Sequence, residues 1–116
     1  MVEIESSQEN DKCILEVKGE IDASSSIHMD NALKETLERG CTKIIVNMEG
    51  LEYISSAGLG VFMSYIEDFK EKNVKFAMYG LSEKVLNVFQ ILGLDQLLEI
   101  TGSKNQAESI VDGVQS

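Results

Sequence analysis

The hydrophobic positions along the 116-residue chain change repeatedly between two spacings. Alternating or continuous apolar runs predict five strands, at residues 2–7, 13–21, 43–48, 74–79 and 97–100. Apolar residues at helical spacing predict four helices, which begin near Ser26, Ser56, Ser82 and Ser103. The first two strands are separated only by the polar segment 8–12, so we expect them to form an antiparallel pair.

The order of these elements indicates the fold class. Strands that alternate with helices require parallel crossover connections, which predicts an α/β fold. We therefore expect a mixed, mostly parallel sheet of about five strands with about four helices packed on it. The length suits one compact domain and is too short for two ordinary ones, so residues 1–116 are expected to form a single domain.

The segment Tyr53–Gly60 lies at the junction between a predicted strand and a predicted helix. A helix N-terminus has unpaired backbone N–H groups and the positive end of the helix dipole, so it stabilises an anion. A phosphate on Ser56 would be favoured there and would add about −1.5 to −2 charges to the surface. We interpret Ser56 as a phosphorylation switch on a binding surface. The alternative is that Ser56 is an ordinary N-cap, and a capping hydroxyl can still be exposed.

Other candidate chemistry is weaker. A serine hydrolase would need the Gly-x-Ser-x-Gly frame and a histidine base, whereas Ser55 and Ser56 lack the first glycine and His28 is the only histidine. We predict no catalytic residue, no metal site and no cofactor. Gly58 could either let the helix start approach its neighbours closely or keep the surface beside Ser56 low. Asp22 is interpreted as a helix cap, or as part of the same rim as Ser56 if both loops lie at one end of the sheet.

The net charge indicates the class of partner, and the cysteines indicate the cellular compartment. The net charge of −10 argues against nucleic acid and anionic membranes as partners, and favours a protein with a basic face. No apolar run approaches the roughly 20 residues that span a bilayer, and the acidic N-terminus is unlike a signal peptide. The spacing of Cys13 and Cys41 suits neither a metal site nor a redox pair. We therefore expect a cytoplasmic protein with two reduced thiols.

Three motifs together resemble one family. They are Gly19–Ala23, the strand end at Ile45–Met48, and Tyr53–Gly60; the segment Leu92–Asp95 also fits. This combination resembles the STAS family, and within it the bacterial anti-sigma factor antagonists. The resemblance implies a partner-switching module whose unphosphorylated form binds an anti-sigma factor with a kinase-type ATP-binding fold. That partner would be the serine kinase, and a serine phosphatase would reverse the modification.

The resemblance also places the site. The phosphorylated serine of the family matches Ser56, and Ser55 is a second candidate acceptor. The implied partner-binding residues are Asp22, Ser55, Ser56, Ala57, Gly58 and Leu59. Two alternatives stay open: an accessory or scaffold STAS subunit of a transporter or signalling assembly without phosphorylation, and a sensor of a nucleotide or another small molecule.

Overall fold

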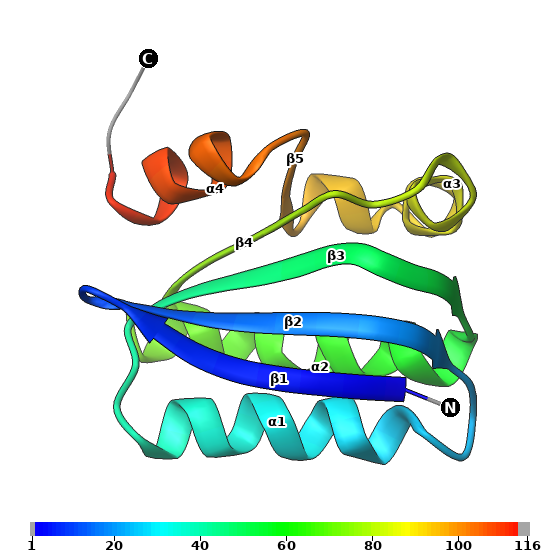
Figure 1. Cartoon of the computed structure of the whole chain (residues 1–116), viewed down its shortest axis with the longest axis horizontal. Helices are drawn as coiled ribbons and strands as arrows, with labels where there is room; N and C mark the ends of the chain where they lie inside the picture. The colour runs from blue at the N-terminus through cyan, green and yellow to red at the C-terminus, as the bar shows by residue number, and fades with distance from the viewer. Residues whose placement is uncertain (1, 114–116) are drawn as a thin grey trace.

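The computed structural model describes residues 2–113 and alternates strands with helices (Figure 1). The strands are β1 (Val2–Glu9), β2 (Lys12–Ile21), β3 (Lys43–Ile54), β4 (Lys75–Tyr79) and β5 (Glu99–Thr101). The helices are α1 (Ser26–Glu38), α2 (Ser56–Glu71), α3 (Glu83–Ile91) and α4 (Lys104–Val111), with a short 3-10 helix, η1, at Leu94–Gln96.

All five strands form one sheet in the order β1-β2-β3-β4-β5. β1 and β2 pair antiparallel, and each later pair of neighbours is parallel. The predicted fold class and the predicted antiparallel first pair are therefore confirmed. Because β2 and β3 are parallel neighbours, the segments that follow them begin at the same end of the sheet.

Several strand boundaries differ from the sequence-based prediction, and β1, for example, continues to Glu9. β3 was expected to stop at Met48 but continues to Ile54, because it stays paired with β2 through two register shifts. The last strand begins at Glu99, and the segment before it turns into η1 after Gly93, which has a left-handed φ of 72°. Val114, expected on the apolar side of the last helix, lies outside the described residues.

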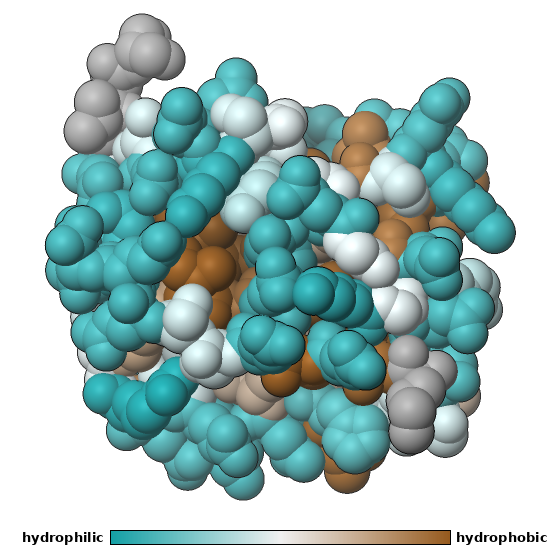
Figure 2. All heavy atoms as spheres, viewed as in Figure 1, coloured by the Kyte–Doolittle hydropathy of each residue, from teal (hydrophilic) through white to brown (hydrophobic). Residues whose placement is uncertain are grey.

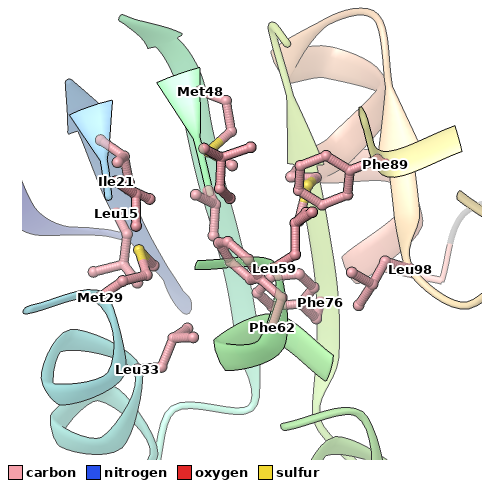
Figure 3. Close-up of a cluster of buried hydrophobic side chains, with 14 of the residues drawn as sticks. Leu15, Ile21, Met29, Leu33, Met48, Leu59, Phe62, Phe76, Phe89 and Leu98 are labelled. Carbon is pink, nitrogen blue, oxygen red and sulfur yellow. The ribbon is translucent and has the colours of Figure 1, made fainter. Parts of the chain in front are cut away.

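The core lies on both faces of the sheet. On one face, α1, α2 and α3 cover the larger apolar cluster, in which Phe62 packs between Phe76 and Phe89 (Figure 3). On the other face, α4 covers a smaller cluster that includes Ile45 and Ala77. Within residues 2–113, no helix has both the length and the apolar character needed to cross a membrane.

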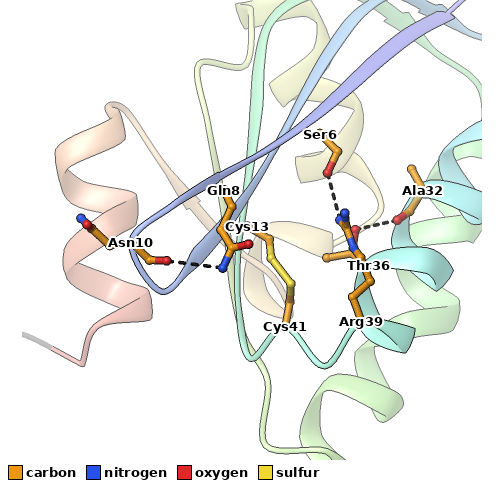
Figure 4. Close-up of a disulfide and its surroundings, with 8 residues drawn as sticks. All are labelled: Ser6, Gln8, Asn10, Cys13, Ala32, Thr36, Arg39 and Cys41. Carbon is orange, nitrogen blue, oxygen red and sulfur yellow. Dashed lines mark hydrogen bonds between the residues drawn. A yellow bond between two sulfur atoms is a disulfide. The ribbon is translucent and has the colours of Figure 1, made fainter.

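The expectation of two reduced thiols is wrong for this structure, which joins Cys13 and Cys41 in a disulfide (Figure 4). Cys13 lies near the start of β2, and Cys41 lies in the connection between α1 and β3. Parallel pairing sets Cys13 opposite Ile44, which brings the residues just before β3 alongside the start of β2. The sequence separation of 28 residues conceals this proximity, because it arises only when the sheet forms.

Candidate partner-binding site

The site is built where β2 and β3 end side by side. Ile21 and Ile54 are register partners at the ends of these strands, and the backbone N–H of Ser55 donates to the carbonyl of Ile21 at 2.8 Å. The loop after β2, which begins at Asp22, therefore lies next to the start of α2. The condition under which Asp22 would share a rim with Ser56, that both loops lie at one end of the sheet, is therefore met.

The two adjacent serines have different roles in the helix start. The N-cap of α2 is Ser55, whose Oγ accepts a hydrogen bond from the backbone N–H of Gly58 at 3.2 Å. The interpretation of Ser56 as the N-cap is therefore wrong: Ser56 is the first helical residue and is exposed. Within residues 2–113, no side-chain hydrogen bond restrains the Ser56 hydroxyl, whereas Ser55 is half-buried and engaged.

The next three residues are divided between surface and core. Ala57 is exposed, but Leu59 is only 1% exposed and belongs to the main core cluster. Gly58 is buried because the helix start lies directly on the strand ends: a Cβ there would stand 2.7 Å from Ile21 Cγ2 and 2.8 Å from Ile54 Cγ1. Gly58 and Leu59 therefore fix the start of α2 on the core, and Ser56 and Ala57 are the residues that a partner can contact.

Asp22 is held in a fixed orientation by the loop that starts α1. Its Oδ1 accepts hydrogen bonds from the backbone N–H groups of Ser24 and Ser25, at 3.0 and 2.8 Å, and from both of their hydroxyls, at 2.9 and 2.8 Å. These donors, led by the Ser25 hydroxyl, lower the pKa of Asp22 to about 2. Asp22 is therefore an anion at neutral pH, fixed beside the start of α2.

Exposed apolar side chains adjoin the same strand and helix ends, and sequence analysis did not single them out. Tyr53, near the end of β3, is 43% exposed, and Ile27, in the first turn of α1, is 58% exposed. Met63, in the second turn of α2, is 48% exposed. We call Asp22, Ile27, Tyr53, Ser56 and Ala57 the Ser56 surface. The signal that could have found Tyr53 is its place one residue before the buried Ile54, on the opposite side of the strand.

Carboxylates surround this end of the sheet. Glu20 lies at the end of β2 and Glu52 near the end of β3, and both are exposed. The N–H groups of Ser56 and Ala57 have no carbonyl partner within α2, because they lie in its first turn. These groups would stabilise a phosphate on Ser56, and the phosphate would add negative charge to an end of the sheet that already carries Asp22, Glu20 and Glu52.

Comparisons with known proteins identify the family of the chain. The family model for the STAS domain matches residues 2–107. The chain is similar to the anti-sigma-B factor antagonist of Listeria monocytogenes, with 29% identity over 84 residues, covering 72% of this chain and 74% of that protein.

Solved structures share the fold. An anti-sigma factor antagonist from Mycobacterium paratuberculosis has a TM-score of 0.88 at 15% identity, covering 97% of this chain and 95% of that one. SpoIIAA, an anti-sigma factor antagonist solved in its unphosphorylated form, has a TM-score of 0.79 at 20% identity, covering 98% of this chain and all of that one (100%). Its phosphorylated form has a TM-score of 0.69 at 18% identity, covering 92% and 97%. At such identities these likenesses show the fold alone.

Proposed function

Because the chain belongs to the STAS domain family, as its resemblance to that family predicted, we propose that residues 1–116 form one STAS domain that acts as an anti-sigma factor antagonist. In this proposal the unphosphorylated protein binds a kinase-type anti-sigma factor in the cytoplasm through the Ser56 surface, and so regulates transcription indirectly. The similarity to curated anti-sigma-B factor antagonists supports this assignment. The protein is then a substrate of its partner and not itself an enzyme.

The observation that carries the proposal is the position of the Ser56 hydroxyl. It is exposed at the N-terminus of a helix, beside a fixed carboxylate, and no side-chain bond within residues 2–113 holds it. Ser55, the second candidate acceptor, already accepts the Gly58 N–H and is half-buried, so phosphorylation there would disrupt the cap. Ser56 is therefore the better acceptor of the two.

Phosphorylation would act through charge at a surface fitted to a neutral hydroxyl. The Ser56 oxygen attacks the γ-phosphorus of ATP bound to the partner, ADP leaves, and the hydroxyl proton passes to a base of the kinase. The product carries about two negative charges at the same end of the sheet as Asp22, Glu20 and Glu52. Burying that charge against a partner without a matching cation costs several kcal/mol, so the complex dissociates. Hydrolysis by a serine phosphatase restores the hydroxyl and the binding state.

The proposal is tested by phosphorylation and binding measured together. The protein is incubated with an anti-sigma kinase and ATP, and the site is mapped by mass spectrometry. We expect modification at Ser56, its loss in Ser56→Ala, and retained binding by that variant. Ser56→Asp should weaken binding by about tenfold or more.

The matched control is Ser64→Asp, which adds the same charge to an exposed position of the same helix, and it should leave binding nearly unchanged. An unmodified Ser56 in the presence of a kinase that is active on another substrate would overturn the switch. That result would favour the accessory-subunit alternative.

A further inference from the structure

β1 is an edge strand with a long unpaired side. It spans eight residues and pairs only with β2, so among the described residues no strand covers its other edge (Figure 1). The opposite edge strand, β5, has only three residues. An exposed strand edge offers a row of backbone N–H and C=O groups that another strand can pair with.

A groove runs along this edge, between β1 and α1. Its volume is about 690 Å³. Val2, Ile4, Leu15 and Ala32 form its apolar part, and polar side chains, among them His28 and Glu35 of α1, line the rest. Arg39 lines one end and donates a hydrogen bond from Nη2 to Ser6 Oγ at 3.0 Å (Figure 4). The groove therefore lies beneath the face of β1 that carries Val2 and Ile4, and it is open to a neighbouring strand at the edge.

The other face of β1 is acidic and lacks enough cations. Glu3 is the register partner of Lys18, and Glu5 is the register partner of Glu16, so two carboxylates stand directly across the pair. Lys18 Nζ lies 3.3 Å from a Glu16 oxygen. Within residues 2–113, Glu3 and Glu5 form no ion pair, although Glu3 is the register partner of Lys18. Figure 2 views the molecule from the same side as Figure 1 and shows a mainly hydrophilic surface.

We propose that β1 binds an extended segment of a partner protein in which apolar and basic residues alternate, by adding that segment to the sheet edge. Side chains of a strand point alternately to the two faces of the sheet. The apolar side chains of the segment then enter the groove beside Val2 and Ile4. The basic side chains lie across from Glu3 and Glu5, where they supply the missing positive charge.

A second copy of this chain does not fit the same edge. Pairing β1 with another β1 would bring two rows that contain Glu3 and Glu5 together, and like charges across a strand pair are destabilising. The carboxylates of Glu3 and Glu5 therefore disfavour pairing between two copies of β1 and favour pairing with a basic segment. The groove shares Asp22 with the Ser56 surface, but β1 itself does not belong to that surface. The test uses the unphosphorylated protein, so its result does not depend on phosphorylation.

The test uses two synthetic peptides of about seven residues, the usual length of a strand. One alternates valine and lysine, and the other has the same composition with valines and lysines in separate blocks. Binding of each fluorescently labelled peptide is measured by anisotropy. We expect the alternating peptide to bind about tenfold or more tightly than the blocked one, because only alternation places all valines on one face.

Variants locate the binding. Glu3→Lys combined with Glu5→Lys should weaken binding of the alternating peptide by about tenfold or more, because it reverses both charges that face the peptide. Glu67→Lys with Glu71→Lys makes the same charge change on exposed positions of α2 and should have a much smaller effect. Ala32→Leu fills the groove and should also weaken binding, and melting temperatures show that each variant is folded.

Three outcomes would overturn the proposal. They are no binding of the alternating peptide, equal binding of the two peptides, and equal losses in the β1 and α2 charge variants. The last two would show attraction to the acidic protein as a whole. Slower amide hydrogen exchange in β1, but not in α2, on adding the alternating peptide would support strand pairing.

Discussion

At the scale of single residues, the start of α2 separates roles that the sequence places side by side. Ser55 satisfies the Gly58 N–H, Gly58 allows the helix to lie on the strand ends, and Ser56 is left exposed. Each role follows from a contact within a few ångströms. A change of one residue should therefore have an effect that its neighbour does not share.

Gly58→Ala should destabilise the protein. The new methyl group would meet Ile21 and Ile54 at less than 3 Å, so the helix start must shift. We expect a loss of about 1–2 kcal/mol in the free energy of unfolding, after the better helix propensity of alanine is included. The control is Gly60→Ala, which has nothing within 4 Å and should stabilise by up to about 1 kcal/mol. Equal effects in chemical denaturation would contradict the close contact at Gly58.

Asp22 should make stability depend on pH in acid. Hydrogen bonds lower its pKa from 3.8 to about 2 in the folded state, so its stabilising contribution is present above the unfolded value and is lost as the pH falls toward 2. Asp22→Asn should melt below wild type near pH 7, and the two melting temperatures should converge as the pH falls through this window. A difference that stays constant with pH would show that the charge of Asp22 is not stabilised by its loop.

At the scale of elements, the distance between α1 and α2 determines the shape of the Ser56 surface, because both helices begin at the end of the sheet where that surface lies. A polar contact links them: the Tyr65 hydroxyl donates to Asp30 Oδ1 at 2.8 Å and is also 3.1 Å from the Asp30 carbonyl oxygen. Burial, with Asp30 next, raises the pKa of Tyr65, so the phenol remains a neutral donor.

Tyr65→Phe should lower the free energy of unfolding by about 1–2 kcal/mol, because it removes the hydroxyl and leaves the partly buried Asp30 oxygens without their donor. Tyr53→Phe is the matched control. It removes the same hydroxyl from a side chain that is 43% exposed and should change stability by less than about 0.5 kcal/mol. Chemical denaturation of both variants checks this, and equal losses would count against the α1–α2 link.

At the scale of the whole molecule, the two ends of the sheet have different properties. The end with Ser56 carries the exposed hydroxyl and the carboxylates of Asp22, Glu20 and Glu52, which form no ion pair within residues 2–113. At the other end, Lys43 Nζ contacts Asp11 and Asp112 at 2.6 and 3.0 Å, and Lys12 Nζ contacts Asp112 at 3.0 Å. These ion pairs join the β1–β2 turn, the start of β3 and the end of α4. The disulfide between Cys13 and Cys41 lies near the same end.

Reducing the Cys13–Cys41 bridge should lower the melting temperature without changing the fold. The bridge closes a loop across a sequence separation of 28 residues, which restricts the unfolded chain and stabilises by about 3–4 kcal/mol. We expect a decrease of roughly 10–15 °C in a dithiol reductant. The variant with Cys13→Ala and Cys41→Ala should melt at the same temperature with and without reductant. A wild-type protein that is indifferent to the reductant would contradict the cross-link.

Much of the fold and of the site was predictable because it depends on local patterns. The serine pair between a buried strand and an amphipathic helix indicated the candidate site. The sequence left open whether Asp22 shares its rim, which the structure decided through the pairing of β2 with β3. The alternative that Ser56 is the N-cap was wrong because β3 extends to Ile54 and the next residue, Ser55, caps α2. The extension of β3 beyond Met48 depends on its register with β2. The exposure of Tyr53 and Ile27 was not predicted, because it depends on which faces other elements leave open.

The sequence by itself determined the types and order of the elements and the acidic charge, since hydrophobic spacing and composition act over a few residues. Only the tertiary structure decided that Ser55 and not Ser56 caps α2, that Cys13 meets Cys41, and that β1 has an open edge above a groove. The disulfide and the groove join residues far apart in the chain, and the cap, although its hydrogen bond is local, follows from where β3 ends its pairing with β2. They depend on strand register and on which helix covers which face, and neither is encoded in any short segment.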